Sequence, residues 1–397
     1  RRPTGGRELM TDIASEGTGR TSMKRIVAIR TGVLVLGMAL AIVGCGGSPT
    51  SDAGGEKAGG AQKSGKAEKL YKEIGGLTGQ ARRDKLVKLA QEEGEFNLYT
   101  SMTSEVADSV TEAFSDEFDV DVNLYRASSE TVLQRVLQEQ KANYAGNDAV
   151  ESNATEMFAL SQEKLLADYQ GERRELVSDT GRFDGWTATR YNLFAPSWNT
   201  KMVKKGEEPT SWEELADPKW DGQLSMEVAD YDWYLSLYGY WEKQGKSKAE
   251  IDKLFADMAS KAKIVKGHTV QGELMSAGQF AITASNYSYL VEQQKRAGAP
   301  VDYQPFVEPV ISRPNGIALM KTAVHPAAAM LFADWILEEG QKVLVDEGLT
   351  PSISPDGSDP LEGIEVIPVD VKALIESGDE WSKKYDEVVA GGEAVEN

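Results

Sequence analysis

The chain has 397 residues, with 43 Lys and Arg, 63 Asp and Glu, two His and one Cys. That length is too great for one ordinary hydrophobic core and predicts two lobes of about 100–200 residues each. The single cysteine excludes a disulfide scaffold and a cysteine-rich zinc site, and the net charge of −20 argues against sequence-independent nucleic-acid binding, which needs a basic face.

The first 44 residues are predicted to be a targeting segment rather than part of a folded domain. Residues 1–22 show no apolar periodicity, and we interpret them as upstream translation or a cloning remnant, with Met23 as the start. A basic segment over 24–30 comes next, and residues 31–44 contain no charge. An apolar segment of this length is typical of a secretory signal and is short for a membrane-spanning helix, which needs about 20 residues.

Cys45 follows this apolar segment directly. A small residue and then a cysteine at this place resembles the lipobox of bacterial lipoproteins. The resemblance implies that residues 23–44 are a signal peptide and that Cys45 is acylated, which would anchor the protein to the membrane. The alternative is a plain signal anchor or a buried free cysteine. The Gly-, Ser-, Ala- and Lys-rich residues that follow predict a flexible tether, to which we assign residues 45–80.

Beyond the tether, helical and extended patterns alternate along the chain. Strands that alternate with helices of ordinary length predict a parallel α/β sheet. The first half is predicted to form helices over 82–93, 106–114, 132–137 and 153–166, and strands over 96–100, 120–125 and 148–151.

The second half continues in the same way and shows no internal repeat. Capping patterns at Thr210 and Ser247 mark two helix starts. Extended runs are predicted over 191–199, 223–228, 280–285, 303–310 and 316–320, and helices over 233–243, 251–262, 268–277, 287–297 and 326–339. Residues 351–368 are predicted to be a loop that precedes two charged helical pieces.

Ligands of parallel sheets bind beyond the carboxyl ends of the strands, where the next helices begin. Helix N-termini present free N–H groups there and attract anions, and an arginine can add a bidentate contact. In the alternative interpretation the hydroxyls only cap their helices, and the arginine forms a salt bridge. The candidate residues at these strand ends are Ser101, Met102, Thr103, Arg126, Ser128, Ser129, Ser152 and Asn153.

Several ordered fragments carry a family resemblance. They lie at 94–101, 125–128, 212–222, 278–282, 298–301, 315–319 and 325–341. In this order, over residues 86–349, the chain resembles a solute-binding protein of a bacterial ABC importer. It is most similar to the branch of ferric-iron receptors and their organophosphate- and phosphonate-binding relatives.

The resemblance implies an α/β fold of the two-lobed type 2 periplasmic-binding class, with hinge strands and a ligand cleft between the lobes. We expect lobe 1 at 81–191 with a return segment at about 307–349, and lobe 2 at 192–304. Residues 350–397 should pack on the lobes as a C-terminal loop and helices. The hinge candidates are 192–198 and 303–310.

The ferric receptors of this branch use a histidine after the first strand, an acid after the third, and two adjacent tyrosines after an asparagine. The matching residues here are Thr103, Ser152 or Asn153, and the run Asn286-Tyr287-Ser288-Tyr289. Most of the ferric ligand set is therefore missing, which disfavours an iron cage made by protein alone. Ferric iron, bare or carried by an anion, is kept as the alternative to a small anionic or zwitterionic organic solute.

Aromatic residues are expected to line the wall that the second lobe contributes. Tyr231 and Trp233 follow a predicted strand, and the neighbouring Asp230 and Asp232 can pair with a ligand amine. The alternatives are core packing for the aromatics and ordinary solvation for the acids. The candidates of the second lobe are Trp198, Tyr231, Asp232, Trp233, Asn286 and Tyr287.

Other classes of protein lack support in the sequence. A Gly-x-Ser-x-Gly motif and a Walker-type loop are absent, and the two histidines have no evident partner, so an enzyme is not expected and the transport ATPase must be another chain. We expect a monomeric extracytoplasmic lipoprotein without cofactor or metal site. Its partners would be a small solute, the ABC permease with its ATPase, and the membrane through the lipid anchor, and not nucleic acid. The remaining alternative is a non-transport surface lipoprotein on the same fold.

Overall fold

The structure is a computed structural model that describes residues 59–356 and 361–395, with side chains from residue 65 onward. Cys45, the expected signal peptide and the start of the tether lie outside the described residues. Within the described part of the chain, no helix combines the length and the apolar character needed to cross a membrane.

The first lobe contains a parallel sheet in which β1 lies between β2 and β3. Each strand is followed by a helix, as the sequence pattern predicts, because the strands end in residues with extended backbone that begin the next helix. Phe96 of β1 packs against Phe114 and Phe332 from the covering helices. The elements are β1 (Glu95–Thr100), α3 (Ser104–Phe118), β2 (Asp121–Arg126), α4 (Ser129–Lys141), β3 (Ala149–Asn153) and α5 (Ala154–Gln162).

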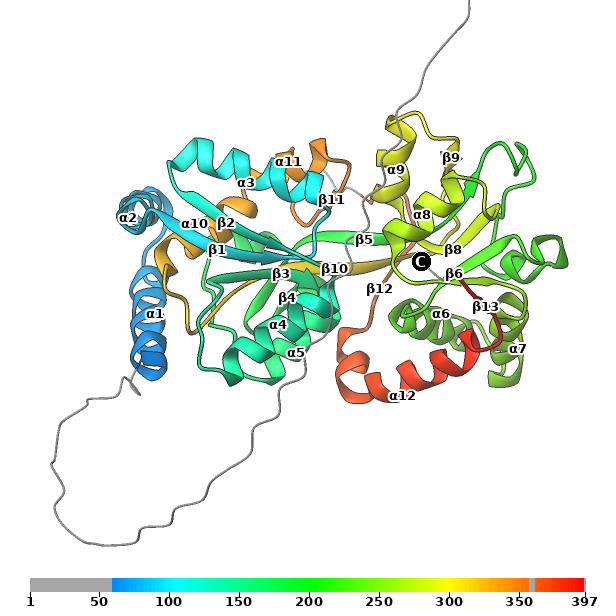
Figure 1. The fold of residues 1–397 in the computed structure, drawn as a ribbon, viewed down its shortest axis with the longest axis horizontal. Helices are drawn as coiled ribbons and strands as arrows, with labels where there is room; N and C mark the ends of the chain where they lie inside the picture. Colours follow the sequence, from blue (N-terminus) through cyan, green and yellow to red (C-terminus); the bar gives the residue numbers. More distant parts are fainter. Residues whose placement is uncertain (1–58, 357–360, 396–397) are drawn as a thin grey trace, which may run out of the picture. The chain divides into compact units, whose positions relative to one another are not determined.

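Two long strands cross from this lobe to the second one (Figure 1). They are β5 (Trp186–Asn199) and β10 (Val310–Leu319), and they pair antiparallel from Ile311↔Phe194 to Ala318↔Trp186. β10 also pairs with β3 of the first lobe, and β5 pairs with β8 of the second. A shorter strand, β12 (Val366–Pro368), runs parallel to β10 at the crossing. The candidate ligand-binding residues lie at one end of each lobe. The crossing strands β5 and β10 hold these two ends close together.

The second lobe repeats the parallel arrangement, with β6 between β7 and β8. Its helices carry a large aromatic core in which Trp233 lies 5.9 Å from Trp212 and 5.6 Å from Phe255 between ring centroids. The elements are β6 (Leu224–Glu227), α6 (Tyr231–Lys243), α7 (Lys248–Ala259), β7 (Lys263–Val265), α8 (His268–Ser276), β8 (Ile282–Tyr287) and α9 (Ser288–Arg296).

The remaining elements complete both lobes. The return of the chain to the first lobe forms α10 (Pro326–Ile336) and α11 (Gly340–Asp346), and the short strands β4 (Arg182–Phe183), β9 (Val301–Asp302) and β11 (Thr350–Pro351) pair with β5. Four short 3₁₀ turns span Glu172–Leu176, Asp179–Gly181, Glu213–Ala216 and Pro218–Trp220. Together these observations show the two-lobed α/β fold expected from the sequence.

The helix before residue 79 differs from the expected flexible tether, whereas the helix predicted over 82–93 is confirmed. The chain is helical over α1 (Gly59–Gly75) and α2 (Gly79–Glu93). Ala67, Tyr71 and Ile74 are buried and lie three to four residues apart, so one face of α1 packs on the lobe. Tyr71 also donates a hydrogen bond to the carbonyl of Met320 at 3.2 Å. Sequence composition alone missed this short apolar stripe, which tertiary packing turns into a helix.

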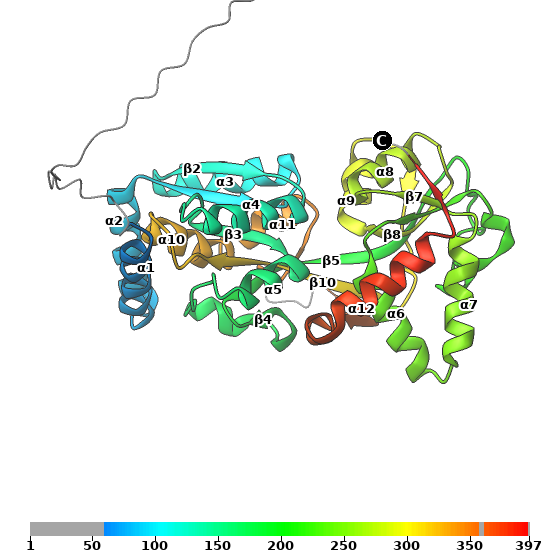
Figure 2. The same ribbon diagram turned by 60° about the horizontal axis from the view of Figure 1, so that its bottom comes forward.

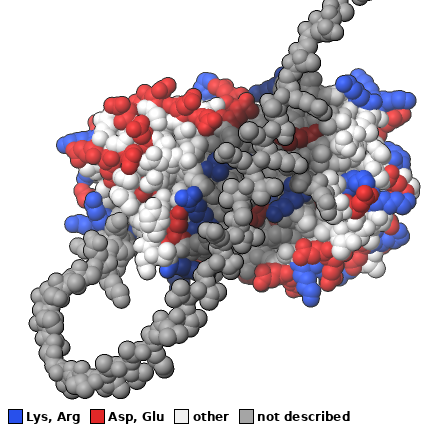
Figure 3. Space-filling model, viewed as in Figure 1, with Lys and Arg blue, Asp and Glu red and all other residues white. Residues whose placement is uncertain are grey.

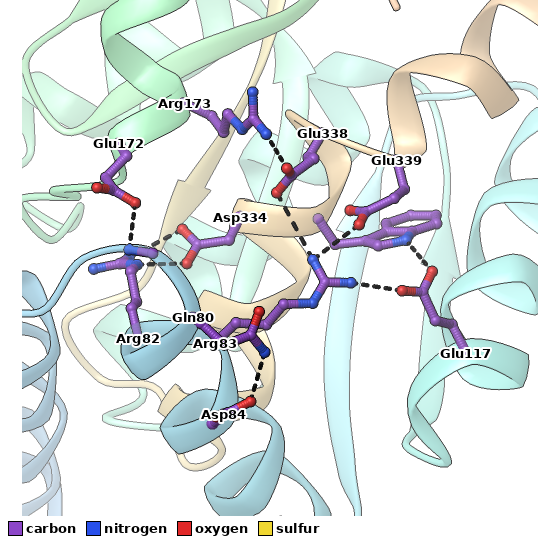
Figure 4. Close-up of polar contacts among 12 residues, drawn as sticks. Gln80, Arg82, Arg83, Asp84, Glu117, Glu172, Arg173, Asp334, Glu338 and Glu339 are labelled. Carbon is purple, nitrogen blue, oxygen red and sulfur yellow. Dashed lines mark hydrogen bonds and ion pairs between the residues drawn. The ribbon is translucent and has the colours of Figure 1, made fainter.

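A charged network joins α2 to the first lobe (Figure 4). Arg82 is buried and forms a two-point ion pair with Asp334 of α10, with Nε–Oδ2 at 2.6 Å and Nη2–Oδ1 at 2.9 Å. Tyr169 donates its hydroxyl to the same carboxylate at 2.6 Å. The neighbouring Arg83 forms more exposed ion pairs with the carboxylates of Glu117, Glu338 and Glu339. The network fastens the N-terminal helices to the lobe.

The C-terminal helix α12 (Val371–Val389) packs on helices of both lobes, α5 and α6 (Figure 2). Ser377 has φ −148° and ψ 22° and interrupts the helical backbone, which accounts for the two helical pieces expected from the sequence. Tyr385 lies 5.6 Å from Tyr234 between ring centroids and donates its hydroxyl to the Glu227 carbonyl at 2.6 Å. The short strand β13 (Glu393–Ala394) then adds to β7.

Acidic side chains gather on the surface over α3 (Figure 3). They are exposed because this helix buries its other face, with Val106, Val110 and Phe114, against the sheet. The exposed acids of α3 are Glu105, Asp108, Glu112, Asp116 and Glu117. The acidity of this helix therefore lies on the outer surface, where charge favours solubility.

Candidate ligand-binding site

A cavity of about 450 Å³ lies between the two lobes, at the carboxyl ends of their parallel strands. Its wall is polar and includes charges of both signs. The first lobe contributes Ser101, Thr103, Arg126, Ser128, Ser129, Asn153 and Glu156; the crossing strands contribute Arg190, Asn192, Arg313 and Asn315; the second lobe contributes Glu227, Asp230, Tyr231, Asp232, His268, Tyr287 and Tyr289.

The hydroxyls of the first lobe divide into caps and free groups. Thr103 caps α3 by accepting from the Val106 N–H, and Ser128 caps α4 by accepting from the Thr131 N–H, each at 3.4 Å. The capping interpretation therefore describes these two hydroxyls. Ser101 differs, because its buried Oγ has no hydrogen-bond partner among the described residues. Because Ser101 also lines the cavity, its hydroxyl is a candidate to contact a ligand.

An amide chain links the first lobe to the crossing strand β10. Asn315 donates to Asn153 Oδ1 at 2.6 Å, and Asn153 donates to Ser129 Oγ at 2.7 Å. The side-chain oxygen of Asn315 is buried and unpartnered within the described part of the chain. Arg126 is exposed, and its Nε donates to the Met102 carbonyl at 2.7 Å. These hydrogen bonds order the wall and leave one buried amide oxygen beside the cavity without a partner among the described residues.

Two buried arginines on the crossing strands form the floor of the cavity. Arg190 lies on β5, ion-paired with Glu151 at 3.2 Å and donating to Asn192 Oδ1 at 2.5 Å. Its Nε has no partner among the described residues. Because β5 is a strand, residues two apart share a face, which puts Arg190 and Asn192 on the same side.

Arg313 on β10 has fewer polar partners than Arg190 among the described residues. Its Nη1 donates to Asp232 Oδ2 at 2.8 Å, and its guanidinium lies 5.2 Å from the Phe194 ring and 5.0 Å from the Tyr287 ring. The residue is only 6% exposed, and its Nε and Nη2 have no hydrogen-bond partner among the described residues. Nε and Nη2 thus form an edge of the guanidinium that is buried beside the cavity without a partner among the described residues, and we call it the open edge of Arg313.

The second lobe supplies a wall of acids and one histidine. His268 Nε2 lies 3.1 Å from Asp230, whose carboxylate also accepts from Ser285 at 2.5 Å. The imidazole stacks on Tyr287, with centroids 3.8 Å apart. Burial opposes protonation of His268, but the Asp230 and Glu227 carboxylates outweigh burial and raise its pKa above the ordinary value. Burial, and then the Asp230 charge, raise the pKa of Glu227 to about 7.

Glu156 lies in the first turn of α5 and enters the cavity from the first lobe. Burial raises its pKa to about 7, although the nearby Arg313 charge opposes that shift. Its Oε2 is buried and unpartnered among the described residues. Tyr231 faces it from the second lobe, and burial together with the Asp232 and Glu156 charges raises the pKa of that phenol.

The structure brings part of the predicted set together. Nine candidates line the cavity: Ser101, Thr103, Arg126, Ser128, Ser129, Asn153, Tyr231, Asp232 and Tyr287. Five do not line it, because their side chains are buried elsewhere. Met102 and Trp198 join the apolar core, Trp233 packs against Trp212, and Ser152 and Asn286 are fully buried beside the strands. For Trp233 the core interpretation holds, since a helix turns neighbouring residues to different faces.

Most of the buried charged residues of the cavity were not predicted from the sequence. Arg190, Arg313, Glu227, His268 and Glu156 were not among the candidates. Arg313 lies in the polar segment 312–316, between the extended runs predicted over 303–310 and 316–320, so its neighbours in the sequence did not indicate a buried charge. His268 has no local signal either, since its partner Asp230 lies 38 residues earlier in the chain.

The described residues include no group of three or more His, Cys, Asp or Glu placed to hold a metal ion. Tyr287 and Tyr289 both line the cavity, with stacked rings whose centroids are 6.0 Å apart. Oxygen donors are therefore present beside the two arginines.

Residues 141–366 match the family described as bacterial extracellular solute-binding protein. Iron uptake protein A1 of Synechocystis sp. is 24% identical over 265 residues, which cover 62% of this chain and 72% of that protein. Iron-bound HitA from Pseudomonas aeruginosa aligns with a TM-score of 0.62 at 17% identity, over 74% of this chain and 99% of that chain. AfuA from Actinobacillus pleuropneumoniae, with fructose-6-phosphate bound, aligns with a TM-score of 0.65 at 17% identity, over 75% and 99%.

Two α/β lobes joined by crossing strands, with a polar cavity lined from both, define a two-lobed binding protein of the periplasmic type. The sequence match covers more than half of the chain. The chain belongs to the bacterial extracellular solute-binding protein family, which confirms the resemblance seen in the sequence. Membership implies an extracytoplasmic location, the binding of a small solute, and delivery of that solute to an ABC permease.

Proposed function

We propose that this protein is a lipid-anchored receptor that captures a small organic anion or zwitterion and delivers it to an ABC importer permease. The observation that carries the proposal is the open edge of Arg313 in the cavity between the lobes. The protein itself performs no chemistry on the solute. The transport ATPase and the permease are separate chains.

The open edge of Arg313 is suited to a carboxylate, phosphate or phosphonate. It is costly to bury N–H groups of a guanidinium that have no hydrogen-bond acceptor. A ligand that accepts hydrogen bonds from both Nε and Nη2 of Arg313 is therefore favoured. The planar fork of arginine matches two oxygens of such an anion, and charge-assisted bonds of this kind are about twice as strong as neutral ones. Arg190 adds positive charge, and Ser101 adds a hydroxyl with no partner among the described residues.

A binding role, rather than an enzymatic one, is supported by the partners of the candidate catalytic groups. Ser285 donates to Asp230 and not to His268, so these three residues do not form a nucleophile–base pair. The members of the family and the similar structures named above are binding proteins.

Ferric iron, alone or with an anion, is the second candidate. Two tyrosines line the cavity, and two of the similar proteins are named for iron uptake or contain iron. A bare cation at the floor would lie beside the guanidiniums of Arg190 and Arg313, and like charges repel, although Glu151 and Asp232 already balance these two charges. An iron–anion complex would fit this cavity better than iron alone, because the anion would face the arginines.

The membrane anchor is part of the proposal and rests on the sequence. Acylation of Cys45 would leave the folded lobes at the membrane surface, connected through the residues before α1. Mass spectrometry of the membrane fraction should find a diacylglyceryl-modified Cys45 at the mature N-terminus. A Cys45→Ser variant should be released from membranes, and an unmodified Cys45 in wild-type protein would contradict the anchor. We propose that the receptor works as a monomer, which size-exclusion chromatography with light scattering tests.

Native mass spectrometry of the full chain tests the ligand class. The panel holds ethylphosphonate, sugar phosphates, carboxylates, polyamines, and ferric iron with and without phosphate or citrate. An organic-anion adduct that Arg313→Gln abolishes and the outer-surface variant Arg182→Gln retains is the expected result. A ferric adduct without a co-anion would replace the organic ligand with iron. The absence of any adduct on folded protein would contradict the transport role.

A further inference from the structure

We propose that Glu156 selects solutes that carry an ammonium group beside their anionic group, so that the cavity is built for a small zwitterion. This inference rests on the proposed function, because it needs an anion at Arg313. It names a second contact, on the opposite lobe from Asp230 and Asp232, and that contact sets specificity.

Three acids of the second lobe line the cavity, and all three have partners within the protein. Asp232 accepts from Arg313 and from the Trp233 N–H, and Asp230 accepts from Ser285 and contacts His268. Glu227 accepts from the N–H groups of Gly267 and Ala229. These three acids of the second lobe are thus engaged within the protein, as expected for buried carboxylates.

Glu156 differs from these three acids, and also from Glu130, which lines the cavity but is exposed. It is 8% exposed, yet its Oε2 has no hydrogen-bond partner among the described residues. Among the carboxylates that line the cavity in the described part of the chain, it alone has such an oxygen. A buried carboxylate oxygen without a donor is unfavourable in the free protein, so a ligand donor that reaches it gains binding energy.

Glu156 and Arg313 lie near each other in the cavity without forming an ion pair. Glu156 and Arg313 are close enough that the Arg313 charge influences the carboxyl, but they form no ion pair within 4 Å in the described residues. Both line the same cavity, from α5 and β10. A ligand that lies between them can therefore place its anion on the guanidinium and its cation on the carboxylate.

The carboxyl of Glu156 should bind a ligand ammonium more strongly than a ligand hydroxyl. The titratable and charged groups that face Glu156 are Arg313, Glu130, Asp232 and Tyr231. Burial raises the pKa of Glu156 to about 7, so the carboxyl is partly protonated near neutral pH. An ammonium beside it favours the ionised form and gains a charge-assisted bond, whereas a hydroxyl gains a weaker neutral one. Binding a zwitterion should then release protons from the protein.

Isothermal titration calorimetry of the full chain with two matched probe pairs tests the inference. The pairs are 2-aminoethylphosphonate with ethylphosphonate, and 4-aminobutyrate with butyrate. Wild-type protein should bind the amino member of at least one pair at least 30-fold more tightly than the other. Near pH 7, comparing buffers of different ionisation enthalpy should show proton release with the amino member.

The variant Glu156→Gln should reduce the preference to less than threefold, keep the affinity for ethylphosphonate, and abolish the proton release. Glu163→Gln, an exposed carboxylate at the end of the same helix, is the matched control and should behave as wild type. A wild-type protein without amine preference, or a Glu156→Gln protein that retains it, would overturn the role of Glu156 and leave the proposed function standing. If fructose-6-phosphate outcompetes both amino probes, the preference for a zwitterion is overturned and the proposed function still stands. If no anion binds, the proposed function fails together with the inference.

Discussion

Arg313 of β10 and Asp232 of α6 form an ion pair at 2.8 Å across the floor of the cavity, with side chains only 7% and 2% exposed. The two residues are 81 positions apart in the chain. Asp232 occupies one end of the guanidinium, and the rings of Phe194 and Tyr287 lie near its faces. The pair therefore orients the remaining N–H groups of Arg313 before any ligand arrives, which reduces the entropy lost on binding.

The open edge of Arg313 makes the shape of the cation matter as well as its charge. Arg313→Lys keeps a positive charge for Asp232 but replaces the planar fork with a point charge. We expect the affinity for organic anions to fall about 100-fold, which corresponds to about 2.7 kcal/mol. Calorimetry with the anion found in the ligand screen measures this loss, and the melting temperature verifies that the variant is folded. An unchanged affinity would show that Arg313 does not contact the ligand.

Three buried groups in the cavity make the stability of the protein depend on pH. Glu156 and Glu227 have folded pKa values of about 7, above the ordinary value of 4.5, and the pKa of His268 is also raised. Between pH 4.5 and 7 the folded state therefore binds more protons than the unfolded state. The free energy of unfolding should fall as pH rises through this window, on the order of 2–3 kcal/mol for each carboxyl. The histidine acts in the same direction, because its contribution is lost as pH rises through its folded pKa.

Thermal unfolding of the ligand-free protein at pH 5, 6, 7 and 8 measures this dependence. The melting temperature should be highest at pH 5, and the variant Glu156→Gln should show a smaller decrease toward pH 8. Asp148 acts in the opposite direction, because hydrogen bonds from His325 and Asn97 outweigh its burial and lower its pKa, so its stabilising effect is lost only at still lower pH. A melting temperature that rises from pH 5 to pH 8 would contradict the raised carboxyl pKa values.

The buried ion pair between Arg82 and Asp334 should matter more than the exposed network beside it (Figure 4). Asp334→Asn leaves a buried guanidinium without a counter-charge and weakens the Tyr169 hydrogen bond. We expect it to lower the free energy of unfolding by about 2–4 kcal/mol. Glu339→Gln, which removes an exposed partner of Arg83, should cost less than about 1 kcal/mol. Urea unfolding compares the two variants, and equal effects would contradict this account of the network.

Trp233 and Tyr287 separate core packing from ligand contact. Trp233 is fully buried against Trp212, so Trp233→Phe should lower the free energy of unfolding by about 1–3 kcal/mol and leave the ligand affinity of the folded protein unchanged. Tyr287 lines the cavity beside Arg313 and His268. Tyr287→Leu should lower affinity at least tenfold. Urea unfolding and calorimetry on both variants test this pair, and a larger affinity loss in the Trp233 variant would contradict the placement.

The sequence predicted the strand–helix order of the first lobe well, because a polar residue follows each of its three parallel strands or ends it and caps the next helix. Ser101, Thr103, Ser128 and Asn153 follow from that rule, and all four line the cavity. The rule failed beside them for Met102 and Ser152. Neighbouring residues at a strand end point to opposite sides, and the sequence does not show which side faces the ligand.

The composition of residues 59–75 also misled, because a single stripe of Ala67, Tyr71 and Ile74 is too short to stand out as a helix. Only the surface of the first lobe, where Tyr71 reaches the Met320 carbonyl, gives that stripe something to pack against. Local propensity for so short an amphipathic segment is weak, and tertiary contacts decide its state.

The sequence by itself determined the class of the fold, the order of its strands and helices, and the family resemblance, because these depend on periodicity and on ordered local patterns. Only the tertiary structure decided the charged floor of the cavity. Arg190 and Arg313 come from strands that cross between the lobes, and their partners Glu151 and Asp232 are distant in the chain. The open edge of Arg313 and the open oxygen of Glu156 exist because pairing is a property of groups brought together in space, which no local pattern of residues encodes.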